Sequence, residues 1–491
     1  MKLHGFSPCW ASSVLKGICA TAKRRLFKVM GAAKVHLHLW PDKCDQEGGE
    51  VLSKVSDGEI GSITLLLLVL LGTAHLFGYL FVRLRQPRVI GEILAGVLLG
   101  PSVLGRLAPS FSLAIFSGVS SGSARHETIL SFIYSLGLLL LMFISGTETR
   151  HLFASGDRRQ IAWLASVGTG LPFLLVLLAA PWIPLQAFTG PANSRTAVLL
   201  VVGIAVAVTS IPVISRIFHD LKILHTRFAS LVLGVATIED IALWAVLAVA
   251  TALVSSSALP EHKIVAHIAA TLVFFAAGLT AAPPLVKRVN SAKWNLLVTA
   301  SPVGYVFGIL FAYTSMAAEW GVSLVFAAFL AGLALRKDSQ RFKDALDSIS
   351  KFSFAVFIPI YFAVVGYRLD LSKSFSVSML VVFLLLACVV KVVSVAVGAR
   401  LAGFPNVDGL NLAIATNARG GPGIVLASVA LDAGIINARF YTTLVLLAVV
   451  TSQAAGAWLE FVLRKGWPLL SGERPKVLPR SEDVVTDNLA P

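Results

Sequence analysis

Two adjacent acids, Glu239 and Asp240, lie in the middle of the apolar stretch VLGVATIEDIALWAVLAVATAL, residues 232–253. An ionised carboxylate at the centre of a bilayer costs roughly 2.5–3.5 kcal/mol, so acids at that depth usually face the protein interior. Burial favours the protonated form of a carboxyl group. One carboxylate that accepts either a proton or a small cation couples the two by competition. Successive helical residues point about 100° apart, so we expect one acid to face a cavity and the other to lie at its edge.

Two basic residues also fall inside apolar stretches. Lys391 lies in LLLACVVKVVSVAVG, and Arg419 lies in ATNARGGPGIVLAS. A lysine at that depth requires a carboxylate partner, for which Asp240 and Glu239 are the candidates. Arg419, together with Asn417, is placed to neutralise the end of the broken helix in which both lie. We therefore expect Lys391, Arg419 and Asn417 to balance charge around the acids.

Helix-breaking residues interrupt two of the apolar stretches. One contains AVAVTSIPVISR and the other contains ATNARGGPGIVLAS. Proline removes a backbone donor and glycine weakens a helix, and freed backbone groups at membrane depth must be buried or line a cavity. Thr209 and Ser210 at the first break offer hydroxyl oxygens, which bind Na⁺ and K⁺ as carbonyls do. The predicted ion- and proton-binding residues are therefore Asp240, Glu239, Thr209 and Ser210, with the monovalent cation on Asp240.

The composition indicates the class of protein that positions these residues. The chain has 491 residues, of which 56% are hydrophobic and only 14% are charged, and its mean hydropathy is +0.81. Soluble proteins are about 25% charged, so we predict an all-α polytopic membrane protein. The net charge of +15 comes from short clusters between apolar stretches, which is typical of membrane flanks and not of a nucleic-acid surface. The four cysteines show no paired spacing, so no metal site or disulfide framework is expected.

Thirteen apolar stretches approach or exceed the ~20 residues that a bilayer crossing requires. They cover residues 62–82, 88–105, 128–147, 160–182, 196–217, 227–254, 263–285, 296–317, 320–335, 352–368, 375–402, 408–431 and 437–463. Lysine and arginine are concentrated after the odd-numbered stretches, which places the C-terminus in the cytoplasm and the start of the first stretch outside. The interrupted stretches are the fifth and the twelfth, so they cross in opposite directions. We therefore predict an inverted repeat with two crossing broken helices.

The chain divides into three parts by composition. Residues 1–60 form a polar, basic extension that is expected to be disordered, residues 61–465 form the transmembrane domain, and residues 466–491 form a short cytoplasmic tail. No cofactor motif is present, and the absence of HExxH and GxSxG patterns argues against an intramembrane enzyme.

Several stretches resemble the cation:proton antiporter-2 family, which includes Kef-type systems, bacterial Na⁺/H⁺ antiporters and plant cation/proton exchangers. The similar stretches are QPRVIGEILAGVLLGPSVLG (86–105), AVTSIPVISRIFHDLKIL (207–224), ATIEDIALW (236–244), LVFAAFLAGLAL (324–335), IPIYFAVVGYRLDL (358–371) and NARGGPGIVLASVALDAGII (417–436). The resemblance implies a thirteen-helix fold with an ion-translocating core and a dimerisation domain.

The resemblance also implies roles for particular residues. It makes Asp240 the essential carboxylate, with Thr209 and Ser210 at the broken helix beside it, and it lets Lys391 pair with the acidic motif. Glu239 stands where relatives commonly have Asp or Asn, which leaves the number of protons moved per cycle open. The implied activity is exchange of Na⁺ or K⁺ for protons by alternating access.

Two other transport activities fit parts of the sequence. A K⁺ channel-like efflux pore on the same fold is the main alternative, whereas an organic-anion symporter fits poorly with two central acids. We expect an integral protein of the bacterial inner membrane, a homodimer that binds monovalent cations and protons within lipid, with no nucleic acid, no cofactor and no enzymatic activity. The sequence leaves open the choice between Na⁺ and K⁺ and the direction of transport.

Overall fold

The structure is a computed structural model of the chain. It describes residues 57–84, 86–110, 112, 116, 124–148, 157–255, 261–292, 295–335 and 340–473. Nearly all of the predicted extension 1–60, and the tail beyond residue 473, lie outside the described residues. The three-part division of the chain therefore stays a prediction.

The described residues are helical, apart from turns, short connections and one isolated antiparallel bridge between Thr189 and Ile436, which confirms the all-α class. The helices are α2 (Asp57–Arg83), α3 (Arg88–Leu99), α4 (Leu104–Leu107), α6 (Ala124–Glu148), α7 (Arg158–Leu178), η2 (Leu185–Ala187), α8 (Arg195–Ala207), α9 (Ile211–Asp220), α10 (Arg227–Ser255), α11 (Glu261–Thr280), α12 (Ala282–Asn290), α13 (Leu296–Ala300), α14 (Pro302–Glu319), α15 (Leu324–Leu335), α16 (Lys343–Ala355), α17 (Phe357–Tyr367), α18 (Val377–Leu401), α19 (Asn406–Ala415), α20 (Gly420–Asp432) and α21 (Ala438–Arg464).

Each predicted stretch falls on one helix or a helix pair, but thirteen full crossings are not confirmed. Among the described residues, eight helical segments are long and apolar enough to cross a bilayer, or nine when the bent pair formed by α11 and α12 counts as one. The fifth and twelfth stretches each split into two shorter helices, because their breaks divide them. The tenth begins earlier than predicted, since the helical segment that includes it starts at Lys343.

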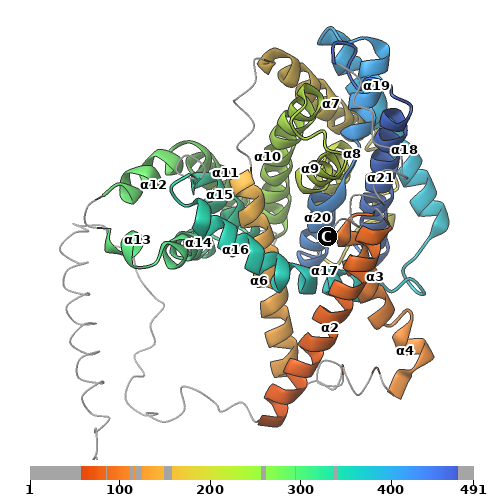
Figure 1. Cartoon of the computed structure of the whole chain (residues 1–491). Helices are drawn as coiled ribbons and strands as arrows, with labels where there is room; N and C mark the ends of the chain where they lie inside the picture. The colour runs from red at the N-terminus through yellow and green to blue at the C-terminus, as the bar shows by residue number, and fades with distance from the viewer. Residues whose placement is uncertain are drawn as a thin grey trace, which may run out of the picture. The chain divides into compact units, whose positions relative to one another are not determined.

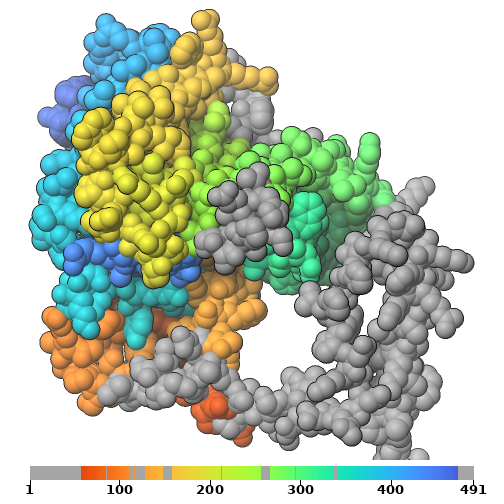
Figure 2. All heavy atoms as spheres, turned by 180° about the vertical axis from the view of Figure 1, so that it is seen from behind, coloured from red at the N-terminus to blue at the C-terminus, as the bar shows by residue number. Residues whose placement is uncertain are grey.

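The helices that form the predicted repeat pack together. We call α7–α10 and α18–α21 the core helices. Within this set α7 contacts α8, α10 and α18, while α20 contacts α8, α9 and α21. Figure 1 shows α8, α9 and α20 lying beside α10. Figure 2, from behind, shows the yellow atoms of α7 beside the cyan and blue atoms of the C-terminal helices.

A second set of helices, α3, α6, α11 and α14–α17, packs together and contacts α10 through α11, and we call these the scaffold helices. Two of its crossings are unusually close. A Cβ atom on Gly332 of α15 or Gly146 of α6 would lie within 2.1 Å of a carbonyl oxygen of the opposing helix, and one on Gly96 of α3 or Gly366 of α17 would lie 1.9 Å away. Only glycine permits such backbone approach, so these pairs hold the scaffold helices in fixed registers.

Candidate ion-binding site

The two broken helices meet at their breaks, as predicted. One break separates α8 from α9 and the other separates α19 from α20. The Ser210 amide donates to the Ala418 carbonyl oxygen at 2.7 Å, and the Thr209 hydroxyl donates to the Thr416 carbonyl oxygen. The backbone at each break thus supplies hydrogen-bond partners for the other, which satisfies groups that neither helix can satisfy alone.

Local sequence explains why α9 begins where it does. The Ser210 hydroxyl accepts a hydrogen bond from the Val213 amide at 3.4 Å and caps the helix. Pro212 lies in the first turn, where a missing amide hydrogen removes no helical bond. The segment TSIP therefore ends one half-helix and begins the next, and it leaves hydroxyl and carbonyl oxygens at the break.

Two cations cap the C-terminal end of α8. Arg419 donates from Nε to the Ala205 carbonyl oxygen and from Nη2 to that of Val206, both at 2.9 Å. Lys391 donates from Nζ to the next carbonyl, that of Ala207, at 2.5 Å. Three successive carbonyls that lack helical partners are thus paired with positive charge, which also offsets the negative end of the helix dipole.

The position of Arg419 extends one prediction. We expected Arg419 and Asn417 to neutralise their own broken helix, and Nη1 of Arg419 donates there to the Asn417 carbonyl oxygen at 3.2 Å and to its Oδ1 at 2.6 Å. The rest of the guanidinium reaches the other broken helix, where it caps α8. The physical reason is the planar fork of arginine, which reaches two neighbouring carbonyls at once where an ammonium cannot.

The carboxylate that pairs with Lys391 is that of Glu239. Lys391 Nζ lies 2.7 Å from Glu239 Oε1, and both side chains are fully buried. Nζ also donates hydrogen bonds to the carbonyl oxygens of Ala207 and of Gly168, the latter at 3.2 Å. Glu239 Oε1 also accepts from the Thr169 hydroxyl at 2.6 Å. Sequence reasoning missed Thr169, although a threonine between two glycines within an apolar stretch is a visible signal.

Asp240 has a different environment from that of its neighbour. Its side chain is completely buried, and neither carboxylate oxygen has a hydrogen-bond partner among the residues that the structure describes. Its helix, α10, packs against both helix pairs that carry the breaks. An ionised carboxylate without partners is strongly disfavoured in a protein interior. The geometry therefore calls for a proton or a cation at Asp240.

Glu239 and Asp240 are both buried, and the expectation that one acid faces a cavity while the other lies at its edge stays a prediction. They do point to different surroundings, and within the described part of the chain Glu239 is paired whereas Asp240 is not. Thr209 and Ser210 are also fully buried, and among the described residues the hydroxyl of Thr209 donates one hydrogen bond while that of Ser210 accepts one. A hydroxyl oxygen has two lone pairs, so each retains acceptor capacity.

A cavity of about 350 Å³ opens next to the site. It is lined by residues of α6, α9, α10 and α16, including Ser215, Thr237, Lys343 and Asp347. Thr237 precedes Asp240 by three residues, about 4.5 Å along the helix axis. The charge bias of the sequence predicts that all these helix ends lie on the cytoplasmic side, so we call this space the cytoplasmic cavity.

Comparison with known proteins assigns the family. Residues 67–465 match the family model described as sodium/hydrogen exchanger, transmembrane. The chain is 26% identical over 396 residues to the Na(+)/H(+) antiporter NhaS4 of Synechocystis, covering 79% of this chain and 93% of that protein. It is 28% identical over 388 residues to the K(+)/H(+) antiporter 1 of Saccharomyces cerevisiae, covering 76% of this chain but only 43% of that protein.

A solved structure shows the same fold. The sodium proton antiporter MjNhaP1 from Methanocaldococcus jannaschii superimposes with a TM-score of 0.57 at 16% identity, covering 84% of this chain and 99% of that one. The chain spans about half the length of several eukaryotic relatives that it matches. It is a multi-pass integral membrane protein of a transporter family and not an enzyme, as expected. The family model covers most of the chain, and the protein therefore belongs to the transmembrane sodium/hydrogen exchanger family.

Proposed function

We propose that the protein exchanges a monovalent cation, Na⁺ or K⁺, for protons by alternating access, with Asp240 as the shared site. The observation that carries this proposal is the fully buried Asp240 carboxyl group, which has no hydrogen-bond partner among the described residues. Such a group is stable when protonated or when it holds a cation, and unstable when it holds neither. The names of relatives that exchange Na⁺ or K⁺ for H⁺ support the same activity.

The exchange follows from competition at one carboxyl group. From the cytoplasmic cavity a cation reaches Asp240, displaces its proton to water and takes ligands from the carboxylate. The oxygens at the break, including the hydroxyls of Thr209 and Ser210, complete the coordination. When the core helices move relative to the scaffold helices, the site opens to the other side, where a proton replaces the cation. Movement with an empty, ionised carboxylate is disfavoured, and this couples the two fluxes.

The surrounding cations have a positioning role in this scheme. Arg419, held by Asn417, and Lys391 neutralise the end of α8 at the crossing. This fixes the backbone oxygens at the break before a cation arrives, which is the electrostatic preorganisation that ion sites require. Because Glu239 is paired with Lys391, we propose that it modifies the charge moved per cycle and does not bind the cation directly.

Orientation and assembly are also proposals. The charge bias supports a cytoplasmic C-terminus, and the likeness to bacterial relatives supports a bacterial inner membrane. Helix α2 carries exposed apolar residues, among them Leu65, Leu68 and Leu76. That face suits either lipid or a second copy of the chain, and we propose a homodimer.

The test uses purified protein in liposomes that hold a pH-sensitive dye. Adding Na⁺ or K⁺ outside should move protons and change the dye signal, and Asp240→Asn should abolish that change while remaining monodisperse on gel filtration. The control is Glu460→Gln, which removes an acid that is paired with Arg464 on the surface of α21. Exchange by Asp240→Asn would refute the assigned site. Cation flux without proton movement in the unmodified protein would instead favour a channel-like pore.

A further inference from the structure

We infer that Trp244, Phe326 and Phe329 form an aromatic gate that closes the path between Asp240 and the non-cytoplasmic side. We call these three residues the aromatic gate. This inference rests on the exchange proposed above, and it adds the residues that hold the site closed on one side. Trp244 belongs to core helix α10, whereas Phe326 and Phe329 belong to scaffold helix α15.

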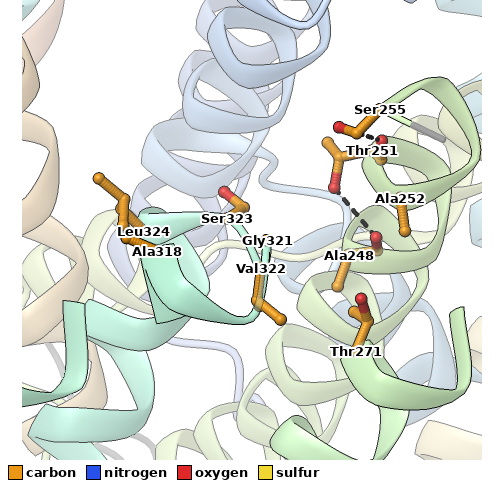
Figure 3. A pocket seen from close by; sticks show the side chains of 10 residues that line it. All are labelled: Ala248, Thr251, Ala252, Ser255, Thr271, Ala318, Gly321, Val322, Ser323 and Leu324. Carbon is orange, nitrogen blue, oxygen red and sulfur yellow. Dashed lines mark hydrogen bonds between the residues drawn. The ribbon is translucent and has the colours of Figure 1, made fainter. Parts of the chain in front are cut away.

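The first observation is a second cavity farther along α10. It has a volume of about 300 Å³ and is lined by residues of α10, α11 and the connection from α14 to α15. Figure 3 shows four of its hydroxyl-bearing side chains, those of Thr251, Ser255, Thr271 and Ser323. The charge bias predicts that this end of α10 lies outside, so we call this space the outer cavity. Its hydroxyl oxygens suit a hydrated cation.

Both cavities share the side of α10 that carries Asp240. At about 100° per residue, Thr237 in the cytoplasmic cavity and Ala248 and Thr251 in the outer cavity all point within roughly 80° of the direction of Asp240. Glu239 is rotated about 100° from Asp240 around the helix axis in the other sense, and it points toward Lys391. A single stripe of α10 therefore connects one cavity, the acid and the other cavity.

Asp240 is not equally close to the two cavities. Thr237 lies about 4.5 Å from it along the helix axis, whereas Ala248, the nearest α10 residue of the outer cavity, lies about 12 Å away. The interval on the cytoplasmic side is less than one helical turn. The distance on the outer side is more than two turns. We therefore expect a side chain on this stripe of α10 to occupy the space between Asp240 and the outer cavity.

Trp244 is the side chain that occupies this space between Asp240 and the outer cavity. It follows Asp240 by one turn and points about 40° from it, and it is the bulkiest of the fully buried side chains in the described structure. Its ring centroid lies 6.3 Å from that of Phe326 and 6.3 Å from that of Phe329, both fully buried. An apolar constriction without room for water excludes hydrated ions. The described conformation is therefore closed toward the outer cavity.

The gate lies between parts that must move relative to each other. The indole belongs to the core helices and both phenyl rings belong to the scaffold helices, so displacement of α10 along α15 separates them. The Trp244 Nε1 hydrogen has no hydrogen-bond partner among the described residues. A buried indole normally finds one, so the closed gate leaves a polar group unsatisfied that water can satisfy once the gate opens. The free-energy cost of this unsatisfied hydrogen lowers the stability of the closed state relative to the open state.

The experiment measures access to the site itself. All four cysteines are replaced by serine, and a single cysteine is introduced as Asp240→Cys or, as the outer probe, Thr251→Cys. A membrane-impermeant methanethiosulfonate reagent is then added to the outer side of oriented vesicles. We expect Thr251→Cys to react and Asp240→Cys to be protected from that side, while Asp240→Cys reacts from the cytoplasmic side.

Opening the gate should remove that protection. With Trp244→Ala or Phe329→Ala added, the outside reaction of Asp240→Cys should accelerate about tenfold or more, equal to ~1.4 kcal/mol of lost closing free energy, and Trp244→Phe should restore most of the protection. The matched control is Phe228→Ala, which removes a fully buried ring of the same helix that packs on Phe218 and lies outside the gate.

Two results would overturn the inference. One is an outside reaction of Asp240→Cys as fast as that of Thr251→Cys with the gate intact. The other is an unchanged rate in Trp244→Ala and Phe329→Ala when both remain monodisperse. Labelling does not require transport, so a protein that exchanges no cation but shows the expected labelling refutes the proposed function alone. A protein that exchanges cations but lacks the labelling pattern refutes the gate alone.

Discussion

Replacing Lys391 with alanine would leave a buried carboxylate without its counter-charge. In the structure the Lys391 ammonium contacts Glu239 Oε1 at 2.7 Å and two carbonyl oxygens, those of Ala207 and Gly168. After the substitution Glu239 keeps the Thr169 hydroxyl on one oxygen, while its Oε2 has no partner among the described residues. The last carbonyl of α8 would also lose its cationic donor.

The magnitude follows from these contacts. Removing one partner of a buried ion pair costs about 3–5 kcal/mol, chiefly because the other charge stays buried. Loss of a cation at a helix C-terminus adds roughly 0.3–1 kcal/mol. We therefore expect Lys391→Ala to lower the free energy of unfolding by about 3–6 kcal/mol. Glu239→Gln should cost less, since Lys391 then keeps two carbonyl oxygens and an amide oxygen.

A double-mutant cycle separates the ion pair from the remaining contacts. Thermal and denaturant unfolding in detergent is measured for Lys391→Ala, Glu239→Gln and the double variant, which has no unpaired charge and should be more stable than Lys391→Ala alone. The control is Arg400→Ala on the exposed end of the same helix, where Arg400 contacts Asn406. Additive losses within ~0.5 kcal/mol would refute the reasoning, because coupled residues deviate from additivity by more than that.

Three further substitutions test other parts of the structure. Arg419→Lys should lower the free energy of unfolding by about 2–4 kcal/mol, because an ammonium replaces the fork that pairs with two carbonyls of α8; an unchanged melting temperature would contradict this. Gly332→Ala should cost about 1–3 kcal/mol, since its Cβ would lie 2.0 Å from a carbonyl oxygen of α6, whereas Gly170→Ala, with open space around it, should cost little. Asp432→Asn should change the melting temperature only slightly, because its partly exposed ion pair with Arg368 contributes about 1 kcal/mol or less, and a large loss would show a stronger role.

Much of the fold could be predicted because its signals are local. Apolar length and helix-breaking residues lie within segments of about 20 residues, so the all-α class and the two breaks are visible in the sequence. The count of crossings could not be predicted in the same way, because a broken stretch becomes two half-helices. The earlier start of the tenth helical segment, at Lys343, was also missed because its first turns are polar.

The site was predictable by residue type but not by pairing. The cost of an isolated charge in lipid identifies Asp240, Glu239, Lys391 and Arg419 as residues with a function. Which of them contact each other depends on helix rotation and on the packing of distant segments. Lys391 and Glu239 are 152 positions apart, and Arg419 and the carbonyl of Ala205 are 214 apart.

The sequence by itself determined that two acids, two basic residues and two broken helices lie at membrane depth, because hydropathy and helix propensity are properties of short segments. Only the tertiary structure decided that, among the described residues, Glu239 is paired and Asp240 is not, that Arg419 caps α8, and that Trp244 meets α15 beside the acid. The reason is geometric. A rotation of about 100° separates the two acids on one helix, and what each then faces depends on helices that the chain brings together from far along its length.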